Sequence, residues 1–180
     1  MLKNIWLHFK LITKHRWYVF KLAYKAGIPF RGFIHDLSKY SPTEFLESAK
    51  YYQGNRSPIN MARQEKGYSE AWLHHKGRNK HHIEYWYDWN IKETPVIPYK
   101  YTIEMLCDHV AAGMVYKGKE WTKEYTLEYW NNIDSTRKLY NPKTEMFLTK
   151  MKEELAKEGI DKVFNKKYLK NEFKKYCEVQ

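Results

Sequence analysis

The segment FIHDLSKYSPTE, residues 33–44, places a histidine directly beside an aspartate and then begins a new helix. Ser41 is a suitable N-cap residue, Pro42 fits the first helical position, and Glu44 completes the pattern of a capping box. We therefore expect a helix from Pro42 to about residue 52, with the His-Asp dipeptide held in a short segment just before it.

Helical periodicity runs along the rest of the chain, and no part of it alternates apolar and polar residues as a strand would. In residues 2–26, apolar side chains and two histidines recur at three- or four-residue intervals up to Gly27, a plausible helix stop. Pro95 and Pro98 exclude a regular helix between residues 92 and 98. The further expected helices are residues 59–66, 69–76, 99–116, 122–133, 143–157 and 161–176. The fold class is therefore all-α.

The character of the chain changes near residue 140. The length of 180 residues fits one domain with a sizeable core, or a domain with a small extension. From about residue 143 the chain is rich in Lys and Glu and has no histidine. We predict one helical domain over residues 1–140 and a Lys/Glu-rich helical extension over residues 141–180 that packs on it.

The composition indicates a globular chain that carries positive charge. Hydrophobic residues make up 43% of the chain and aromatic residues 17%, which excludes a disordered protein. The formal net charge is +11, and no acidic residue precedes Asp36. The basic residues of that first part are Lys3, Lys10, Lys14, Arg16, Lys21, Lys25 and Arg31. This charge favours phosphorylated small molecules, nucleic acid or an acidic membrane surface as partners, and a solvated lysine-rich surface is the alternative.

Cysteine usage and hydropathy bear on the compartment. Cys107 and Cys177 form no CxxC pair, so neither a disulfide framework nor a zinc ribbon is expected. Lys10, Lys14 and Arg16 interrupt the apolar residues near the N-terminus, so a signal peptide is not expected. No segment approaches the length of about 18 consecutive apolar residues that a membrane span needs. We therefore expect a cytoplasmic protein.

Histidine is concentrated in the first part of the chain. All eight histidines lie at or before residue 109, and two doublets fall in LHHKGRNKHH, residues 73–82. Imidazole and carboxylate ligands together suit Zn, Mn, Fe, Co or Ni, and Asp36 and Asp108 are available as carboxylates. Solvated surface histidines are the alternative interpretation.

Two of the candidate ligands fall on helix faces that we expect to be buried. His15 lies two turns after His8 on the apolar face of the first helix, and Asp108 shares a face with Met105 and Ala111. A buried carboxylate is costly unless it is paired or bound to a metal. A metal ion would partner both side chains, and a core histidine or a salt bridge to Lys or Arg is the alternative.

The order of these residues resembles the HD-domain superfamily of metal-dependent phosphohydrolases, which is all-helical. That superfamily has an early helix histidine, a contiguous His-Asp and a late helix aspartate, which His15, His35, Asp36 and Asp108 match here. The resemblance covers about residues 8–115.

Longer motifs refine the resemblance. HDLSK is similar to the HD-x-G-K form of the HD-GYP branch, with Ser38 in place of the glycine. HHKGRN departs from the HH-E segment of that branch, because Lys76 replaces the Glu and no GYP triplet follows. The chain is most similar to an uncharacterised bacterial and phage family with HDLSK-x-SP-x-EF, AW-x-HH, N-x-HH-x-EYW and EM-x-CD motifs.

The resemblance implies an HD-domain-like helical bundle that binds one or two divalent metal ions (Mn, Fe, Zn, Co, Ni or Mg). The implied metal ligands are His15, His35, Asp36, His74, His75, His81, His82 and Asp108. Asp36 would bridge a first metal, on residues 15, 35 and 108, to a second metal on the histidine doublets. Because adjacent helical residues point about 100° apart, we rank His74 and His82 above His75 and His81.

The implied reaction is cleavage of a phosphoester, for example in a nucleotide, by a metal-activated water. Asp36 and Lys39 are the implied catalytic residues, and Lys39, Arg78 and Lys80 would hold phosphate oxygens. A solvated lysine is the alternative for Lys39. Two other functions stay open: an HD-type di-iron oxygenase, and a non-enzymatic binder of nucleic acid or an anionic membrane through the basic N-terminal helix.

Overall fold

The computed structural model describes residues 2–178, and within them it contains helices and loops but no strand. The all-α fold class is confirmed. The α-helices are α1 (Leu2–Lys25), α2 (Pro29–Ile34), α3 (Pro42–Lys50), α4 (Pro58–Lys66), α5 (Glu70–Lys76), α6 (Tyr99–Lys117), α7 (Tyr125–Asn131), α8 (Asp134–Arg137), α9 (Pro142–Glu158), α10 (Ile160–Val163) and α11 (Lys166–Phe173). The described residues also form three short 3₁₀-helices, η1 (Leu37–Tyr40), η2 (Ile83–Tyr85) and η3 (Gly118–Glu120), and a π-helix, η4 (Lys174–Glu178).

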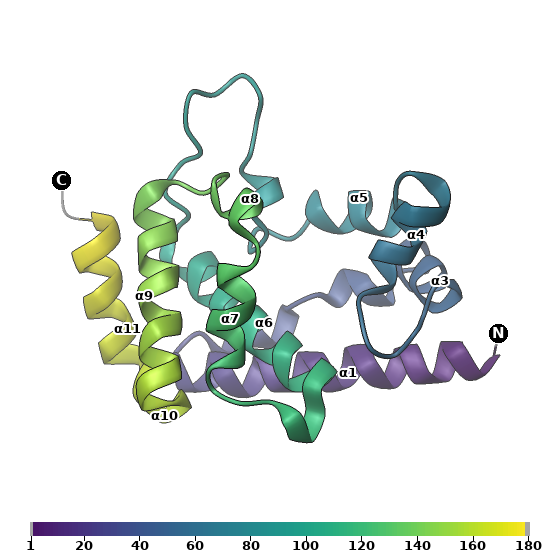
Figure 1. Ribbon diagram of the computed structural model, residues 1–180, viewed down its shortest axis with the longest axis horizontal. Helices are drawn as coiled ribbons and strands as arrows, with labels where there is room; N and C mark the ends of the chain where they lie inside the picture. Colours follow the sequence, from purple (N-terminus) through teal and green to yellow (C-terminus); the bar gives the residue numbers. More distant parts are fainter. Residues whose placement is uncertain (1, 179–180) are drawn as a thin grey trace.

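The long helix α1 runs along one edge of the molecule, and the other helices are arranged on it in two groups (Figure 1). Helices α3, α4 and α5 lie over its N-terminal half, whereas α7, α9, α10 and α11 lie towards its C-terminal end. Helix α6 packs against α1 between the two groups. The side chains that converge from α1, α5 and α6 therefore meet in the middle of the molecule.

One hydrophobic core connects the two predicted parts of the chain. Val19 and Leu22 of α1 belong to the same buried cluster as Leu106 of α6. Phe147 and Leu148 of α9 are fully buried in that cluster as well. The C-terminal helices thus pack on the core formed by the first 140 residues.

The segment that carries the His-Asp dipeptide is fixed to α1 by a close helix crossing. Helix α2 meets α1 at Gly32, where an added Cβ would lie only 2.5 Å from the Cβ of Ala23 and 3.0 Å from the Cα of Phe20. Arg16 then donates from Nε to the carbonyl of His35 at 2.7 Å and from Nη2 to the carbonyl of Phe33 at 2.6 Å. These contacts determine where the backbone of His35 and its neighbour lies.

Two predicted helix boundaries are wrong. The helix predicted over 161–176 is interrupted, because Asn165 accepts hydrogen bonds at Oδ1 from the backbone N–H groups of Lys167 and Tyr168 and caps a new helix. The helix predicted over 122–133 begins only at Tyr125, and the 3₁₀-helix η3 precedes it. Within residues 2–178, no helix has both the length and the apolar character needed to cross a membrane.

Candidate metal centre

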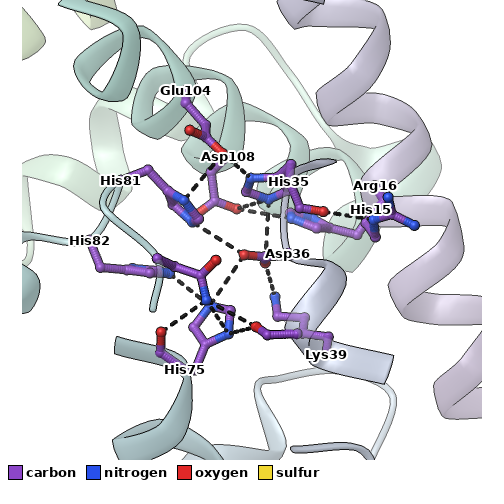
Figure 2. Close-up of polar contacts among 12 residues, drawn as sticks. His15, Arg16, His35, Asp36, Lys39, His75, His81, His82, Glu104 and Asp108 are labelled. Atoms are coloured by element: carbon purple, nitrogen blue, oxygen red, sulfur yellow. Dashed lines mark hydrogen bonds and ion pairs between the residues drawn. The ribbon is translucent and has the colours of Figure 1, made fainter. Parts of the chain in front are cut away.

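Histidine and carboxylate side chains from five separate segments converge between α1 and α6 (Figure 2). Each segment supplies one or two of them. The converging residues are His15 of α1, His35 and Asp36 before η1, His75 of α5, His81 and His82 before η2, and Glu104 and Asp108 of α6.

Asp36 belongs to two groups of side chains that could each hold a metal ion. The ligand atoms of each group lie within 4.8 Å of one another, and the groups are His15, His35, Asp36 and Asp108, and Asp36, His75, His81 and His82. Asp36 Oδ2 lies 3.3 Å from His35 Nε2 in the first group. Asp36 Oδ1 lies 3.3 Å from His75 Nε2 and 3.4 Å from His81 Nε2 in the second group. The carboxylate therefore presents one oxygen to each group.

The other members of the two groups complete the convergence. In the first group, His15 Nε2 lies 2.9 Å from Asp108 Oδ1, and His35 Nε2 lies 3.7 Å from the same oxygen. In the second group, His75 Nε2 and His82 Nε2 are 3.0 Å apart. The structure thus brings together seven of the eight predicted ligands, all except His74.

Buried atoms at the centre lack hydrogen-bond partners of adequate geometry. Nε2 of His15, His35 and His81 and both oxygens of Asp36 are buried and make no hydrogen bond of good geometry to another described group, although His15 Nε2 lies close to Asp108 and Asp36 Oδ2 lies close to Lys39 Nζ. Leaving a buried polar atom unpaired costs about 1–3 kcal/mol, and more when the group is charged. Three imidazole nitrogens beside the two oxygens of one carboxylate fit a divalent cation bound by imidazole and carboxylate ligands.

The backbone at Asp36 adopts the left-handed conformation. Its φ is 52° and its ψ is 30°, and among residues 2–178 it is the only residue other than glycine with a positive φ. Aspartate and asparagine tolerate this region better than other side chains, but the conformation still carries strain. Strained backbone of this kind often occurs where a side chain must be aimed at a functional site.

Glu104 contacts one histidine from each group. Its Oε1 accepts a hydrogen bond from His35 Nδ1 at 3.1 Å and lies 3.4 Å from His81 Nδ1. Arg31 donates to the other oxygen, from Nε at 2.7 Å. Burial opposes ionisation of Glu104, but the hydrogen bonds from His35 and His81 lower its pKa to about 2. An ionised Glu104 places the imidazole protons on Nδ1 and leaves both Nε2 atoms free to bind a metal.

Glu44 orients His75 of α5 in the same way as Glu104 orients His35 and His81. Its carboxylate does not close the capping box that the sequence predicted. Ser41 Oγ accepts from the Glu44 backbone N–H, but the carboxylate of Glu44 accepts from Nδ1 of His74 and of His75, each at 2.7 Å. The prediction that the Glu44 side chain accepts from the Ser41 backbone N–H is therefore wrong. That N–H donates to the carbonyl oxygen of Ser38 instead.

The two histidines of the first doublet lie in different places. His75 points to Asp36, whereas His74 is bound to Glu44 and belongs to none of the ligand groups in the described chain. The ranking of His74 above His75 is therefore opposite to the geometry. In the second doublet both His81 and His82 reach the centre, because these residues lie in a turn and not in a regular helix.

Both carboxylates and two of the imidazoles have the protonation states of metal ligands. Burial alone would raise the pKa of Asp36, but the positive charges of His35 and Lys39 hold it well below its usual range. Burial also opposes ionisation of Asp108, and hydrogen bonds from His15 and His35 lower its pKa. Burial lowers the pKa of His15 and of His82. Ionised carboxylates and neutral imidazoles are the forms that bind metals. His35 differs, because burial opposes its protonation but the negative charge of Asp36 raises its pKa above the usual value, so a metal would have to displace its proton.

Of the three predicted phosphate-binding residues, Lys39 lies at the metal-ligand groups, whereas Arg78 and Lys80 make other contacts. Lys39 Nζ lies 2.6 Å from Asp36 Oδ2, and the negative charges of Asp36 and Asp108 raise its pKa although burial opposes this. Arg78 is exposed and donates to the carbonyl of His74, and Lys80 lies over the rings of two tyrosines. Lys39 therefore touches the metal-ligand groups, while the roles of Arg78 and Lys80 stay predictions.

Comparison with known proteins places the chain in a family. The model of a family of unknown function, DUF5662, matches residues 4–154. The chain belongs to this family. The matched region of this DUF5662 member contains every residue of both ligand groups, from His15 to Asp108. No curated protein and no solved structure gives a significant match.

Sequence reasoning missed Glu44 and Glu104 as parts of the site. Glu104 lies one helical turn before Asp108 in the EM-x-CD motif, so both carboxylates point from the same side of α6. That spacing was a usable signal. Glu44 gave a weaker signal, because a glutamate three residues after a serine is also expected at any capped helix start.

Proposed function

We propose that this DUF5662 protein is a metal-dependent hydrolase that cleaves a phosphoester, for example in a nucleotide. The observation that supports the proposal most strongly is the division of Asp36, with one oxygen turned to each ligand group. A shared carboxylate can hold two metal ions close together, which is the arrangement that many phosphoester hydrolases use. The two groups would hold the metals through the side chains described above.

A bound pair of divalent metals would supply positive charge and a water of lowered pKa near the phosphoryl group. The chain itself would contribute Lys39, whose ammonium group can hold a phosphate oxygen and neutralise negative charge that develops there. Glu104 and Glu44 would keep the imidazoles oriented, with their protons held on Nδ1.

Substrate would approach from the side of the site that is partly open. The side chain of Lys39 is 29% exposed and that of Asp108 is 14% exposed, whereas Asp36 and His35 are fully covered. A phosphoester arriving on this side would meet Lys39 first. The positive charge of the chain would also favour the approach of an anionic substrate.

A phosphate-release assay tests the proposal. The purified protein would be loaded separately with Mn, Fe, Co, Zn, Ni and Mg and offered nucleotides, phosphomonoesters and phosphodiesters. We expect release with at least one metal, and loss of release in Asp36→Asn. Lys39→Met should lower kcat about 100-fold because a charged hydrogen-bond donor is removed. Lys119→Met, an exposed lysine of η3, is the matched control and should behave like the unmodified protein.

The second candidate function is oxygen activation by a pair of iron ions. The second ligand group contains three histidines and one aspartate, and imidazole ligands suit iron. Oxygen consumption by the iron-loaded protein, together with no phosphate release from the whole substrate panel, would contradict the phosphohydrolase proposal and favour this alternative.

A further inference from the structure

We propose that the outer face of α1 docks on an anionic membrane surface. The outer face comprises residues that recur every three or four positions on the side opposite the buried histidines: Leu2, Trp6, Phe9, Thr13, Trp17, Phe20 and Tyr24. This spacing places all of them on one side of a helix. In Figure 1 α1 lies along the edge of the molecule, and most of the large side chains of the outer face are exposed.

The aromatic side chains of the outer face contact each other and remain largely exposed, although Phe9 also packs against Tyr40. Trp6 is 56% exposed and Trp17 is 57% exposed. The Trp6 ring stacks on Phe9 with centroids 5.9 Å apart, and Trp17 stacks on Phe20 at 5.7 Å. Monomeric soluble proteins rarely expose a continuous apolar surface of this kind unless it binds something.

Helix α2 adds further apolar surface beside the outer face. Its Gly32 packs on Phe20 of α1, and its own Phe30 and Phe33 are exposed. The apolar surface is therefore formed by two helices that are held rigidly together. A rigid surface can bind without first ordering a flexible segment.

A row of lysines runs along one edge of the outer face. Lys3, Lys10, Lys14, Lys21 and Lys25 alternate at seven- and four-residue intervals, which places them on one helix side next to the aromatic rings. Lys10 Nζ lies 4.8 Å from the Trp6 ring centroid, and Lys21 Nζ lies 5.9 Å from that of Trp17. No acidic residue occurs before Asp36, but Lys25 forms an ion pair with Asp161, so the charge of the row is carried mainly by the other four lysines.

This combination of charge and apolar surface fits an anionic lipid bilayer better than other occupants. A helix in the bilayer interface buries Trp, Phe and Leu side chains and places its lysines among the lipid headgroups. A second copy of this chain would bring two lysine rows together, which like-charge repulsion opposes. Nucleic acid requires cations across the contact, whereas the centre of the outer face is aromatic and aliphatic.

Membrane docking through the outer face of α1 is independent of the proposed hydrolase activity. The metal-ligand groups use His15 on the opposite side of α1, so membrane docking leaves them in place. Asp36→Asn should therefore bind vesicles as the unmodified protein does, whether or not it retains any activity.

Co-sedimentation with vesicles tests the inference. We expect binding to phosphatidylcholine vesicles that contain phosphatidylglycerol, weak binding to phosphatidylcholine alone, and weakening with added salt. The double variant Trp6→Ala, Trp17→Ala should bind about tenfold or more weakly, because two large apolar side chains no longer enter the interface. Trp89→Ala is the matched control, since Trp89 is 88% exposed and belongs to the loop between η2 and α6. Figure 1 shows this teal loop at the opposite edge of the molecule from α1.

A second double variant tests the charge of the outer face, and four outcomes would overturn the proposal. Lys10→Glu, Lys21→Glu changes only exposed residues and should also lose about tenfold or more in affinity for anionic vesicles. Equal binding to neutral and anionic vesicles, or unchanged binding by both double variants, would overturn the proposal. Binding of an oligonucleotide without vesicle binding, or a dimer that the tryptophan variant dissociates, would assign the outer face to another occupant and overturn it too.

Discussion

Glu104 is the residue on which both ligand groups depend, since His35 and His81 each place Nδ1 against its Oε1. Glu104→Gln keeps the size of the side chain but removes the charge that holds those protons. We expect affinity for both metals to fall about 10–100-fold, as when other partners of metal-bound histidines are replaced. Calorimetric titration with Zn or Mn would measure both binding steps.

Glu44→Gln is the matched comparison, because Glu44 supports only His75 of the second group. It should weaken one binding step and leave the other unchanged. If Glu104→Gln titrated like the unmodified protein, with two unchanged steps, the carboxylate would serve only to hold Arg31. A thermal melt without metal would measure how much stability the loss of the Arg31–Glu104 ion pair costs, separately from any change in metal affinity.

Lys152 carries a separate prediction about stability and pH. Its side chain is buried on α9, with Nζ 3.8 Å from the Trp130 ring centroid. Burial lowers its pKa well below the usual 10.5, the charge of Glu145 opposes this, and Arg137 lowers it further. Burial lowers the pKa of His109 to about 3. At pH values between the folded and the unfolded pKa of Lys152, the unfolded chain therefore binds more protons than the folded chain. Stability should rise with pH towards about 10.5, where the unfolded lysine also loses its proton.

The variant Lys152→Met isolates this effect. It removes the titrating amine while keeping a long apolar side chain, so it should be more stable than the unmodified protein at neutral pH. The difference between the two should shrink as pH rises towards 10, because the penalty for deprotonating the lysine disappears. Urea unfolding at a series of pH values measures it, and two parallel curves would show that Lys152 stays protonated in the core.

The sequence predicted which residues of α1 are buried, but it did not predict which of the buried histidines reaches a carboxylate. The seven-residue spacing correctly places both His8 and His15 on the buried face, but only His15 joins a ligand group. His8 packs instead against the rings of Phe45 and Tyr52. Which buried histidine meets a carboxylate depends on the packing of distant helices, which spacing within one helix does not contain.

The crossing of α1 and α2 is the element contact that sets the position of the His-Asp dipeptide. Gly32→Ala would bring a methyl group to 2.5 Å from Ala23, so the helices must separate. We expect a loss of about 1–3 kcal/mol in unfolding free energy from this overpacking, together with weaker metal binding. Urea denaturation and metal content per chain measure the two effects.

Gly77→Ala is the control for this change. Gly77 has a φ of −72°, and the nearest atom to an added Cβ is the Leu73 carbonyl oxygen at 3.5 Å, so alanine should fit. Its unfolding free energy should change by less than about 1 kcal/mol. If Gly32→Ala were equally neutral, the close crossing would not be what positions the dipeptide.

Local signals located most of the elements. Ser41 and Ser69 cap α3 and α5 through backbone N–H groups. The break at Asn165 was not predicted, because the residues around it continue the helical pattern, although α10 ends at Val163 and Asn165 caps α11. Sequence patterns therefore predict helices well where the ends carry strong caps and less well where a short helix follows another directly.

At the scale of the whole molecule, the candidate metal centre joins segments that are far apart in the sequence. Its ligands come from α1, the turn before η1, α5, the turn before η2 and α6. Composition and pattern predicted the all-α class, and the resemblance to the HD-domain superfamily implied that His15, His35, Asp36 and Asp108 form one ligand group. They did not predict how the remaining histidines are shared, since that depends on two turns whose conformations are set by long-range contacts.

Because the centre ties these segments together, metal binding should stabilise the entire fold. A metal present at about 100 times its dissociation constant adds about 2.7 kcal/mol to the unfolding free energy. For a chain of this length that corresponds to a rise of about 5–10 °C in Tm. Since α9 shares its core with α1 and α6, both ends of the molecule should unfold in the same transition.

Differential scanning calorimetry with Mn or Zn, and then with a chelator, measures the shift in Tm. Asp36→Asn tolerates the left-handed backbone but lacks the shared charge, so it should show little or no shift. A Tm that is the same with metal and with chelator would contradict metal binding at this centre.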